Sequence, residues 1–250
     1  MIRGGRAAPW GAALLLLACT TGRRSARELI FPSPYLEAVL VPPAADDSAR
    51  TYPLLVALHG YGDTAAGFVR AFGGGSWERC FVAVPEAEHA VANGGTSWFQ
   101  LTRDRTQWEA ADRRTVATVV ALIGALRSRY RIGEVYLLGF SQGAALAYQT
   151  GLLNPSLVSG IAAISGGLPP IDTVGAIVHA ADLAGATGPR ILVARGRDDP
   201  AVGHRALREQ ADFLVSRGFA VTRYEFAGGH DLPAEALERV ARWMREEARR

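Results

Sequence analysis

Five residues near the middle of the chain, Gly139-Phe140-Ser141-Gln142-Gly143, restrict its fold more than any other segment. The apolar run at residues 135–138 precedes them, and an alanine-rich stretch that suits a helix follows them. A strand and a helix joined by so sharp a turn pass close to each other, and the glycines two residues before and after Ser141 leave room for that approach. The segment predicts a strand, a strained turn and a helix, with the Ser141 hydroxyl raised above the carboxyl edge of a parallel sheet.

The rest of the chain alternates between short apolar runs, bounded by Gly and Pro, and amphipathic stretches. This pattern predicts an α/β fold in which a mostly parallel, twisted sheet is covered by helices on both faces. We expect strands at residues 37–41, 53–59, 80–85, 134–140, 160–165, 190–195 and 219–226. The clearest helix covers residues 107–130, where Thr106 and Glu109 fit a capping box, and others begin near Asp63, Ser141, Gly203 and Pro233.

Length and composition fit a single domain that does not bind nucleic acid. A chain of 250 residues is long enough for one well-filled α/β core. Charged residues make up 20% of it, the formal net charge is only +3, and the arginines are spread along the chain. We therefore expect no nucleic-acid partner.

The N-terminal residues carry signals for export. Arg3 and Arg6 precede an apolar segment at residues 10–18 that is too short to span a bilayer stably and has the form of a secretory signal. The segment ends in Leu16-Leu17-Ala18-Cys19, which resembles the lipobox of bacterial lipoproteins, where the cysteine is lipidated. The alternatives are an ordinary signal peptide cleaved nearby and a start codon placed too early.

These signals predict the domain organisation and the location of the protein. We expect a signal peptide over residues 1–19, a polar tether over residues 20–29, and one domain over residues 30–250. Several acyl chains on Cys19 would hold the protein durably at a membrane, since each buried methylene contributes about 0.8 kcal/mol. The prediction is therefore an exported lipoprotein of the cell envelope.

A serine at such a turn needs a general base, and the usual chain order is serine, acid, histidine. His230 fits the base, because it follows the predicted strand at residues 219–226 and precedes a helix. The acid should follow the strand at residues 190–195, where Asp198 and Asp199 are both available. We choose Asp199, because it stands three residues after a glycine and directly before a proline. The alternative for each of these residues is an ordinary turn residue.

Two N–H groups should face the oxyanion that forms when the serine attacks. We assign them to Gln142, directly after the serine, and to Tyr61, in the loop after the strand at residues 53–59. Trp98, Phe99 and Phe140, together with the Tyr61 ring, are candidates for the wall of a substrate pocket. Core packing explains these aromatic residues equally well.

Several segments together resemble the phospholipase/carboxylesterase branch of the α/β-hydrolase superfamily, which includes acyl-protein thioesterases and bacterial carboxylesterases. The segments are residues 59–64, Ser97-Trp98-Phe99, residues 139–143, residues 196–202 and Gly229-His230, and the resemblance covers roughly residues 37–245. It implies an α/β-hydrolase fold and hydrolysis of small carboxylic esters or thioesters by Ser141, Asp199 and His230, without a metal or other cofactor. It also places Trp98 close to the pocket.

The sequence departs from the family pattern at two positions. Arg195 stands where many relatives have histidine, and Tyr61 replaces the leucine common in thioesterases. Two other functions stay open: a serine peptidase on the same fold, and a catalytically inert envelope lipoprotein that binds a ligand. A peptide-amide assay distinguishes the first, and reaction of Ser141 with an active-site phosphonate distinguishes the second. The oligomeric state is not predicted.

Overall fold

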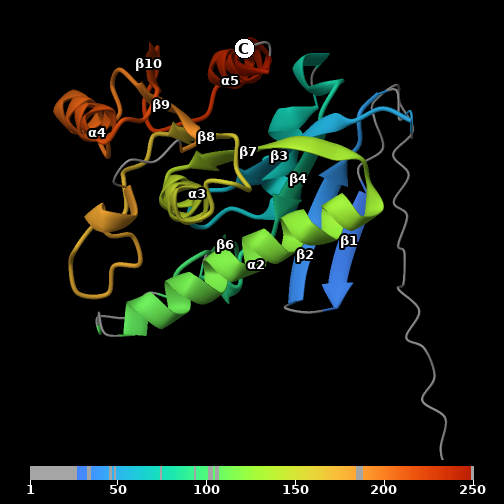
Figure 1. Ribbon diagram of the computed structural model, residues 1–250, viewed down its shortest axis with the longest axis horizontal. Coiled ribbons are helices and arrows are strands. Elements are labelled where there is room, and N and C mark those ends of the chain that lie inside the picture. Colours follow the sequence, from blue (N-terminus) through green and yellow to red (C-terminus); the bar gives the residue numbers. More distant parts are fainter. Residues whose placement is uncertain are drawn as a thin grey trace, which may run out of the picture.

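The computed structural model describes residues 27–32, 35–44, 47, 49–73, 75–92, 94–100, 104, 107–183 and 188–248 (Figure 1). The predicted signal peptide, Cys19 and residues 20–26 of the predicted tether lie outside these residues, as does Thr106. Within the described part of the chain, no helix has the length and apolar character needed to cross a membrane.

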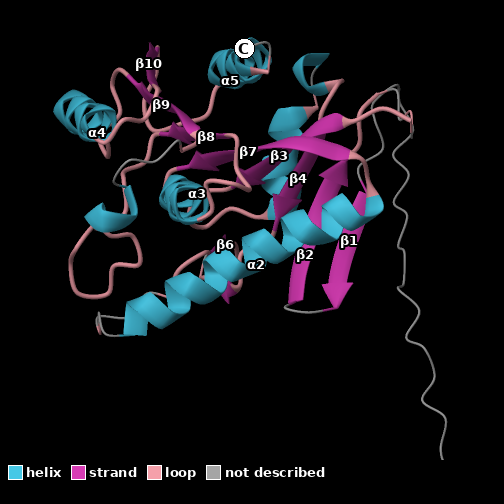
Figure 2. Cartoon of the chain, in the orientation of Figure 1, coloured by secondary structure: helices cyan, strands magenta, loops and turns pink. Residues whose placement is uncertain are grey.

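One twisted sheet of eight strands forms the centre of the fold, in the order β1-β2-β4-β3-β7-β8-β9-β10 (Figure 2). The strands are β1 (Arg27–Pro32), β2 (Tyr35–Val41), β3 (Tyr52–Leu58), β4 (Phe81–Pro85), β7 (Ile132–Phe140), β8 (Gly160–Ile164), β9 (Arg190–Gly196) and β10 (Val221–Phe226). Strand β2 runs antiparallel to β1 and β4, and the pairs from β4 to β10 are parallel. The seven predicted strands are confirmed, with ends within two residues of those expected.

Strand β1 was not predicted. It begins at Arg27 and pairs along its whole length with β2, so residues 27–29 belong to the sheet and not to a tether. A short hairpin of β5 (His89–Ala90) and β6 (Thr96–Ser97) was also not predicted, and it lies in the segment between β4 and the first long helix.

Helices cover both faces of the sheet, as predicted (Figure 1). They are α1 (Ala65–Phe68), α2 (Trp108–Arg129), α3 (Gln142–Leu153), α4 (His204–Ser216) and α5 (Ala234–Glu247), with 3-10 turns at Val69–Phe72, Gly75–Trp77 and Ala180–Leu183. Helix α2 has Gln107 at its N-cap without a side-chain capping bond. Glu109, expected in a capping box, instead pairs with Arg113 at 3.1 Å.

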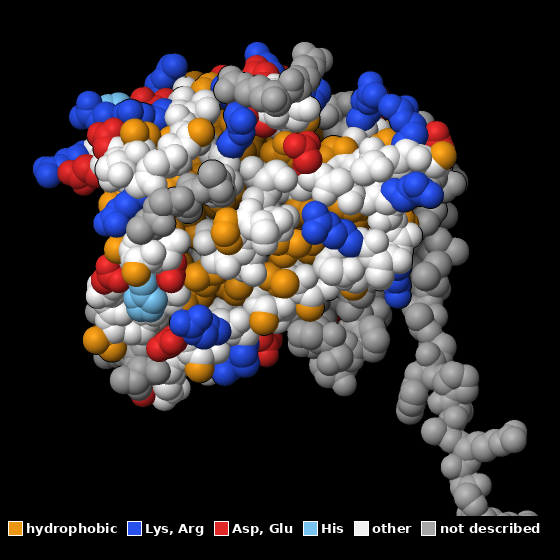
Figure 3. All heavy atoms as spheres, in the orientation of Figure 1, with side chains coloured by type: hydrophobic (Ala, Val, Ile, Leu, Met, Phe, Trp, Pro, Cys, Tyr) orange, Lys and Arg blue, Asp and Glu red, His pale blue; other side chains and the backbone are white. Residues whose placement is uncertain are grey.

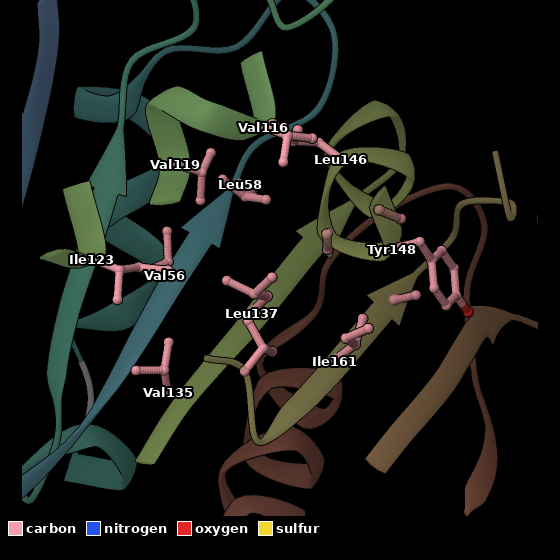
Figure 4. Packing of buried hydrophobic residues seen from close by; sticks show 14 of the residues in the cluster. Val56, Leu58, Val116, Val119, Ile123, Val135, Leu137, Leu146, Tyr148 and Ile161 are labelled. Carbon is pink, nitrogen blue, oxygen red and sulfur yellow. The ribbon is translucent and has the colours of Figure 1, made fainter. Parts of the chain in front are cut away.

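Alternating residues of the central strands fill two separate cores. Leu54, Val56 and Leu58 of β3 point to the face covered by α2, α3 and α4, whereas Leu55 and Ala57 point to the face covered by α1 and α5. All five are completely buried. Figure 4 shows side chains of α2 and α3 packed over the strands in the first core. Since truncating a buried Leu to Ala costs about 2–5 kcal/mol, these layers hold the carboxyl edge of the sheet in a fixed position.

Candidate active site

The turn at Ser141 has the strained geometry that the sequence predicts. Strand β7 ends at Phe140, α3 begins at Gln142, and Ser141 between them has φ 52° and ψ −114°. A Cβ atom at Gly139 would lie 2.2 Å from the Gly143 carbonyl oxygen, and one at Gly143 would lie 2.2 Å from the Leu58 carbonyl oxygen. Such distances are far below normal contact, so only glycine fits at either position. The backbone thereby presents the Ser141 hydroxyl at the carboxyl edge of the sheet.

Ser141, His230 and Asp199 form one hydrogen-bonded chain. The His230 Nε2 atom lies 2.8 Å from Ser141 Oγ, and its Nδ1 atom lies 3.1 Å from both carboxylate oxygens of Asp199. His230 comes from the loop between β10 and α5, and Asp199 from the loop after β9. Three loops at the same edge of the sheet therefore bring together residues that are far apart in the sequence. This arrangement can transfer a proton from the serine to the histidine.

Asp199 is held in place by the backbone of its own loop. Its Oδ1 atom accepts hydrogen bonds from the N–H groups of Ala201 at 2.8 Å and Val202 at 3.0 Å. Burial tends to raise the pKa of Asp199, but the hydrogen bonds from Val202, Ala201 and His230 outweigh it and hold that pKa below its usual range. Asp199 is buried, whereas the neighbouring Asp198 is exposed. The carboxylate beside His230 is thus Asp199, and it remains ionised at neutral pH.

The loop after β3 lies against the turn. A Cβ atom at Gly60 would lie 3.5 Å from Ser141 Cβ and 3.1 Å from the Phe140 ring, so the Gly60 backbone lies directly beside the serine. The next residue is Tyr61, whose side chain is half exposed. Among the described residues, neither the Tyr61 N–H nor the Gln142 N–H has a hydrogen-bond acceptor. Gln142 is the first residue of α3, where the N–H groups generally lack an intrahelical acceptor.

Trp98 lies in the core beneath this loop. Its side chain is 2% exposed, and its Nε1–H donates to the His59 carbonyl oxygen at 2.8 Å. The two rings are 4.8 Å apart between centroids, and His59 is completely buried. Trp98 therefore supports the loop that carries Tyr61. It does not present its ring at the molecular surface.

The Gln142 side chain links the turn to the β6 segment, a contact that the sequence does not predict. Its Oε1 atom accepts from the Trp98 N–H at 3.0 Å, and its Nε2–H donates to Ser97 Oγ at 2.9 Å. Helix α3 is thus joined to the segment that contains Ser97, Trp98 and Phe99. The occurrence of Ser97-Trp98-Phe99 and Ser141-Gln142 in one chain was the available signal for this contact.

The other predicted pocket residues, Phe140 and Phe99, lie on opposite faces of the sheet. The Phe140 ring is half buried, 5.2 Å from the His230 ring between centroids, and it packs against the core on the α1 and α5 side. Phe99 is half buried on the α2 and α3 side.

Arg195, one of the departures from the family pattern, is buried and pairs with Glu225 at 2.9 Å. Glu225 also binds the exposed His204 at 2.8 Å, so this pair braces β9 against β10.

In the part of the chain that the structure describes, no group of three or more His, Cys, Asp and Glu side chains is placed to hold a metal ion.

The comparisons with known proteins point to one family. The family model described as Phospholipase/Carboxylesterase matches residues 44–247. A protein of Oryza sativa subsp. japonica named "Probable carboxylesterase" is 28% identical over 230 residues, which are 86% of this chain and 85% of the relative. A protein of Arabidopsis thaliana named "Probable carboxylesterase SOBER1-like" is 27% identical over 218 residues, or 80% of each chain.

Solved structures show the same fold. The crystal structure of esterase PE8 superposes with a TM-score of 0.64 and 26% identity, and the match covers 83% of this chain and 96% of that one. The predicted α/β-hydrolase fold is thereby confirmed.

Proposed function

The chain belongs to the phospholipase/carboxylesterase family and is an ester hydrolase, and we propose that it cleaves carboxylic esters through a covalent acyl-enzyme on Ser141. The observation that carries this proposal is the 2.8 Å contact between Ser141 Oγ and His230 Nε2. The same histidine contacts Asp199 through its other ring nitrogen. A nucleophile, its base and the group that orients the base are therefore in contact before substrate binds.

In the first half-reaction, His230 Nε2 takes the Ser141 proton while Oγ attacks the ester carbonyl carbon. Asp199 accepts the Nδ1–H bond, which fixes the tautomer with a free Nε2 and stabilises the imidazolium that forms. The C–O bond to the alcohol then breaks, and His230 Nε2–H protonates the leaving alkoxide. The product is an ester between the acyl group and Ser141.

In the second half-reaction, water repeats these steps. His230 deprotonates the water as it attacks the acyl carbon, and the Ser141 oxygen leaves with the proton returned by His230. In both steps the N–H groups of Tyr61 and Gln142 hold the oxyanion. Loss of one such donor typically costs about 2.7–4 kcal/mol of barrier. A thioester reacts by the same steps, with a thiolate as the leaving group.

The test is hydrolysis of p-nitrophenyl esters from acetate to palmitate by the protein without residues 1–19, compared with Ser141→Ala. We expect the wild type to release p-nitrophenol and the variant to retain its fold without activity. Turnover by Ser141→Ala at the wild-type rate would refute the proposal. Cleavage of peptide amides in preference to all esters would favour the peptidase alternative.

The N-terminal prediction leads to a separate proposal, that Cys19 carries lipid and holds the enzyme at the cell envelope. It rests on the Leu16-Leu17-Ala18-Cys19 segment alone. Expression of the full chain in a bacterium with labelled palmitate should give a labelled, membrane-bound protein, and Cys19→Ala should lose both the label and the membrane association. Equal labelling of both proteins would contradict the assignment.

A further inference from the structure

An apolar groove of about 320 Å³ lies next to Gln142, the residue after Ser141, between the start of α2, one face of α3 and the loop after β8. The rings of Phe99 and Trp108 line it together with Ala145, Pro169 and Pro170. It lies on the side of the molecule where α2 and α3 cover the sheet (Figure 1), and Figure 3 shows hydrophobic side chains exposed over these helices.

The groove extends from the catalytic turn along α3. Gln142, Ala145 and Gln149 all line it, and their spacing places them on one face of the helix. With a rise of 1.5 Å per residue, Gln149 lies about 10 Å along the axis from Gln142. Three extended chain atoms cover about 3.5 Å, so about nine atoms cover this distance. A medium-length chain attached to Ser141 could therefore reach from the turn to Gln149.

The end of the groove farthest from Ser141 is polar. The Nε2–H of Gln149 donates to Asp112 Oδ2 at 2.6 Å, and both residues line the groove. Gln149 is 3% exposed, and its Oε1 atom has no hydrogen-bond donor among the described residues. Burial raises the pKa of Asp112, and the bond from Gln149 opposes that rise. An amide oxygen without a donor and a half-buried carboxylate thus stand side by side among apolar side chains.

Such a pair is unsuited to the end of a plain hydrocarbon chain. A methyl group placed there would cover the carboxylate and offer it no hydrogen bond besides the one from Gln149, and covering a charged acceptor without a donor is unfavourable. A hydroxyl or ammonium group would donate to the carboxylate of Asp112, which Gln149 holds in place, whereas the Gln149 Oε1 atom is itself shielded from solvent. The chemistry of the pair therefore selects a donor.

We propose that this groove binds the acyl chain of the substrate and that Asp112 and Gln149 recognise a hydrogen-bond donor at the far end of that chain, so that medium-length ω-hydroxyacyl or ω-aminoacyl esters are preferred. The inference rests on the proposed function, because the acyl group is the part of the substrate that becomes joined to Ser141. It extends that function by naming the substrate class.

The first test compares kcat/KM for the p-nitrophenyl esters of octanoate, ω-hydroxyoctanoate and ω-aminooctanoate. We expect the wild type to favour at least one of the two substituted esters over octanoate by about 3- to 10-fold, the value of one hydrogen bond. The comparison of hydroxyl with ammonium identifies which donor the pair accepts. An equal or higher kcat/KM for octanoate overturns the proposal.

Variants of the pair should bring the ratio of kcat/KM for the preferred substituted ester to kcat/KM for octanoate close to one. Asp112→Leu removes the carboxylate, Gln149→Met removes the amide that donates to it, and circular dichroism with urea denaturation shows whether each variant folds. Glu109→Gln is the matched control, because it removes a carboxylate from an exposed position of the same helix, outside the groove. A preference that is unchanged in both Asp112→Leu and Gln149→Met contradicts the assignment.

A binding measurement separates this inference from the proposed function. Calorimetric titration of Ser141→Ala with octanamide, ω-hydroxyoctanamide and ω-aminooctanamide requires no hydrolysis. If a substituted amide binds more tightly than octanamide, and this difference is lost in the double variant Ser141→Ala/Gln149→Met, the groove recognises the donor at the chain end. This result holds even if the wild type cleaves no ester. Equal binding of all three amides refutes it even if Ser141 proves to be the nucleophile.

Discussion

Substitution of Gly143 by alanine tests how strictly the catalytic turn depends on its backbone. Gly143 lies in the first turn of α3, and an added Cβ would be 2.2 Å from the Leu58 carbonyl oxygen and 2.7 Å from that of His59. Both oxygens belong to the backbone at the end of β3, so the clash cannot be relieved by rotating a side chain. To restore contacts of about 3.4 Å, α3 or the end of β3 must move by about 1 Å.

The structure sets the size of two effects of Gly143→Ala. Forced overpacking of this kind costs about 1–3 kcal/mol, against which alanine regains up to about 1 kcal/mol of helix propensity. We therefore expect a net loss of about 1–2 kcal/mol in the free energy of unfolding. Because the same shift moves the Tyr61 N–H relative to Ser141, a displacement of 1 Å should reduce kcat/KM by about 100-fold.

The matched control is Gly124→Ala. Gly124 is also within a helix, α2, but a Cβ there would meet no atom within 4 Å. This variant should gain about 0.5–1 kcal/mol of stability and keep full activity. Urea denaturation gives both stabilities, and hydrolysis of p-nitrophenyl butyrate gives both rates. If Gly143→Ala matches the wild type in both assays, the argument from close backbone approach is wrong.

Three further predictions concern the acid and the supporting core. Asp199→Asn should lower kcat by about a thousandfold or more, since it removes the group that orients His230, while Asp198→Asn should stay near the wild-type rate; the reverse result would move the acid to Asp198. Because the pKa of Asp199 is lowered in the folded protein, its charge contributes stability that is fully present above the unfolded-state value of about 3.9 and is lost as the pH falls through the lower folded value. The difference in unfolding free energy between wild type and Asp199→Asn should therefore be constant from about pH 5 to 7 and shrink below about pH 4, and a difference that grows on acidification would contradict the sign. Trp98→Phe leaves the buried His59 carbonyl without its donor and should cost about 1–3 kcal/mol in urea denaturation; unchanged stability would show that this bond does not support the loop.

The parts of the fold predicted from sequence are those with strong local signals. Buried parallel strands are continuous apolar runs, and the turn at Ser141 requires glycine at fixed offsets. Strand β1 has neither signal, because it is an edge strand that pairs only with β2 and its segment follows a polar stretch. A strand of this type is specified by its partner and not by its own periodicity, so it was assigned in part to a tether.

Sequence order could place residues at the carboxyl edge but not orient their side chains. It placed Ser141, Asp199 and His230 in loops of the right strands, and the structure brings them into contact. The order of residues along the chain does not show which way an aromatic side chain points. Trp98 could therefore be assigned equally to a pocket or to the core. The Asp112–Gln149 pair joins two helices through a tertiary contact, and no local pattern marks it.

Labelling with a fluorophosphonate, followed by peptide mapping and a parallel assay, tests the acyl-enzyme on Ser141 most directly. The reagent phosphonylates a serine that an adjacent histidine activates. We expect one adduct, on Ser141, with hydrolysis lost in proportion to the fraction labelled and no adduct in His230→Ala. Labelling of another serine, or full hydrolysis after complete labelling of Ser141, would contradict it.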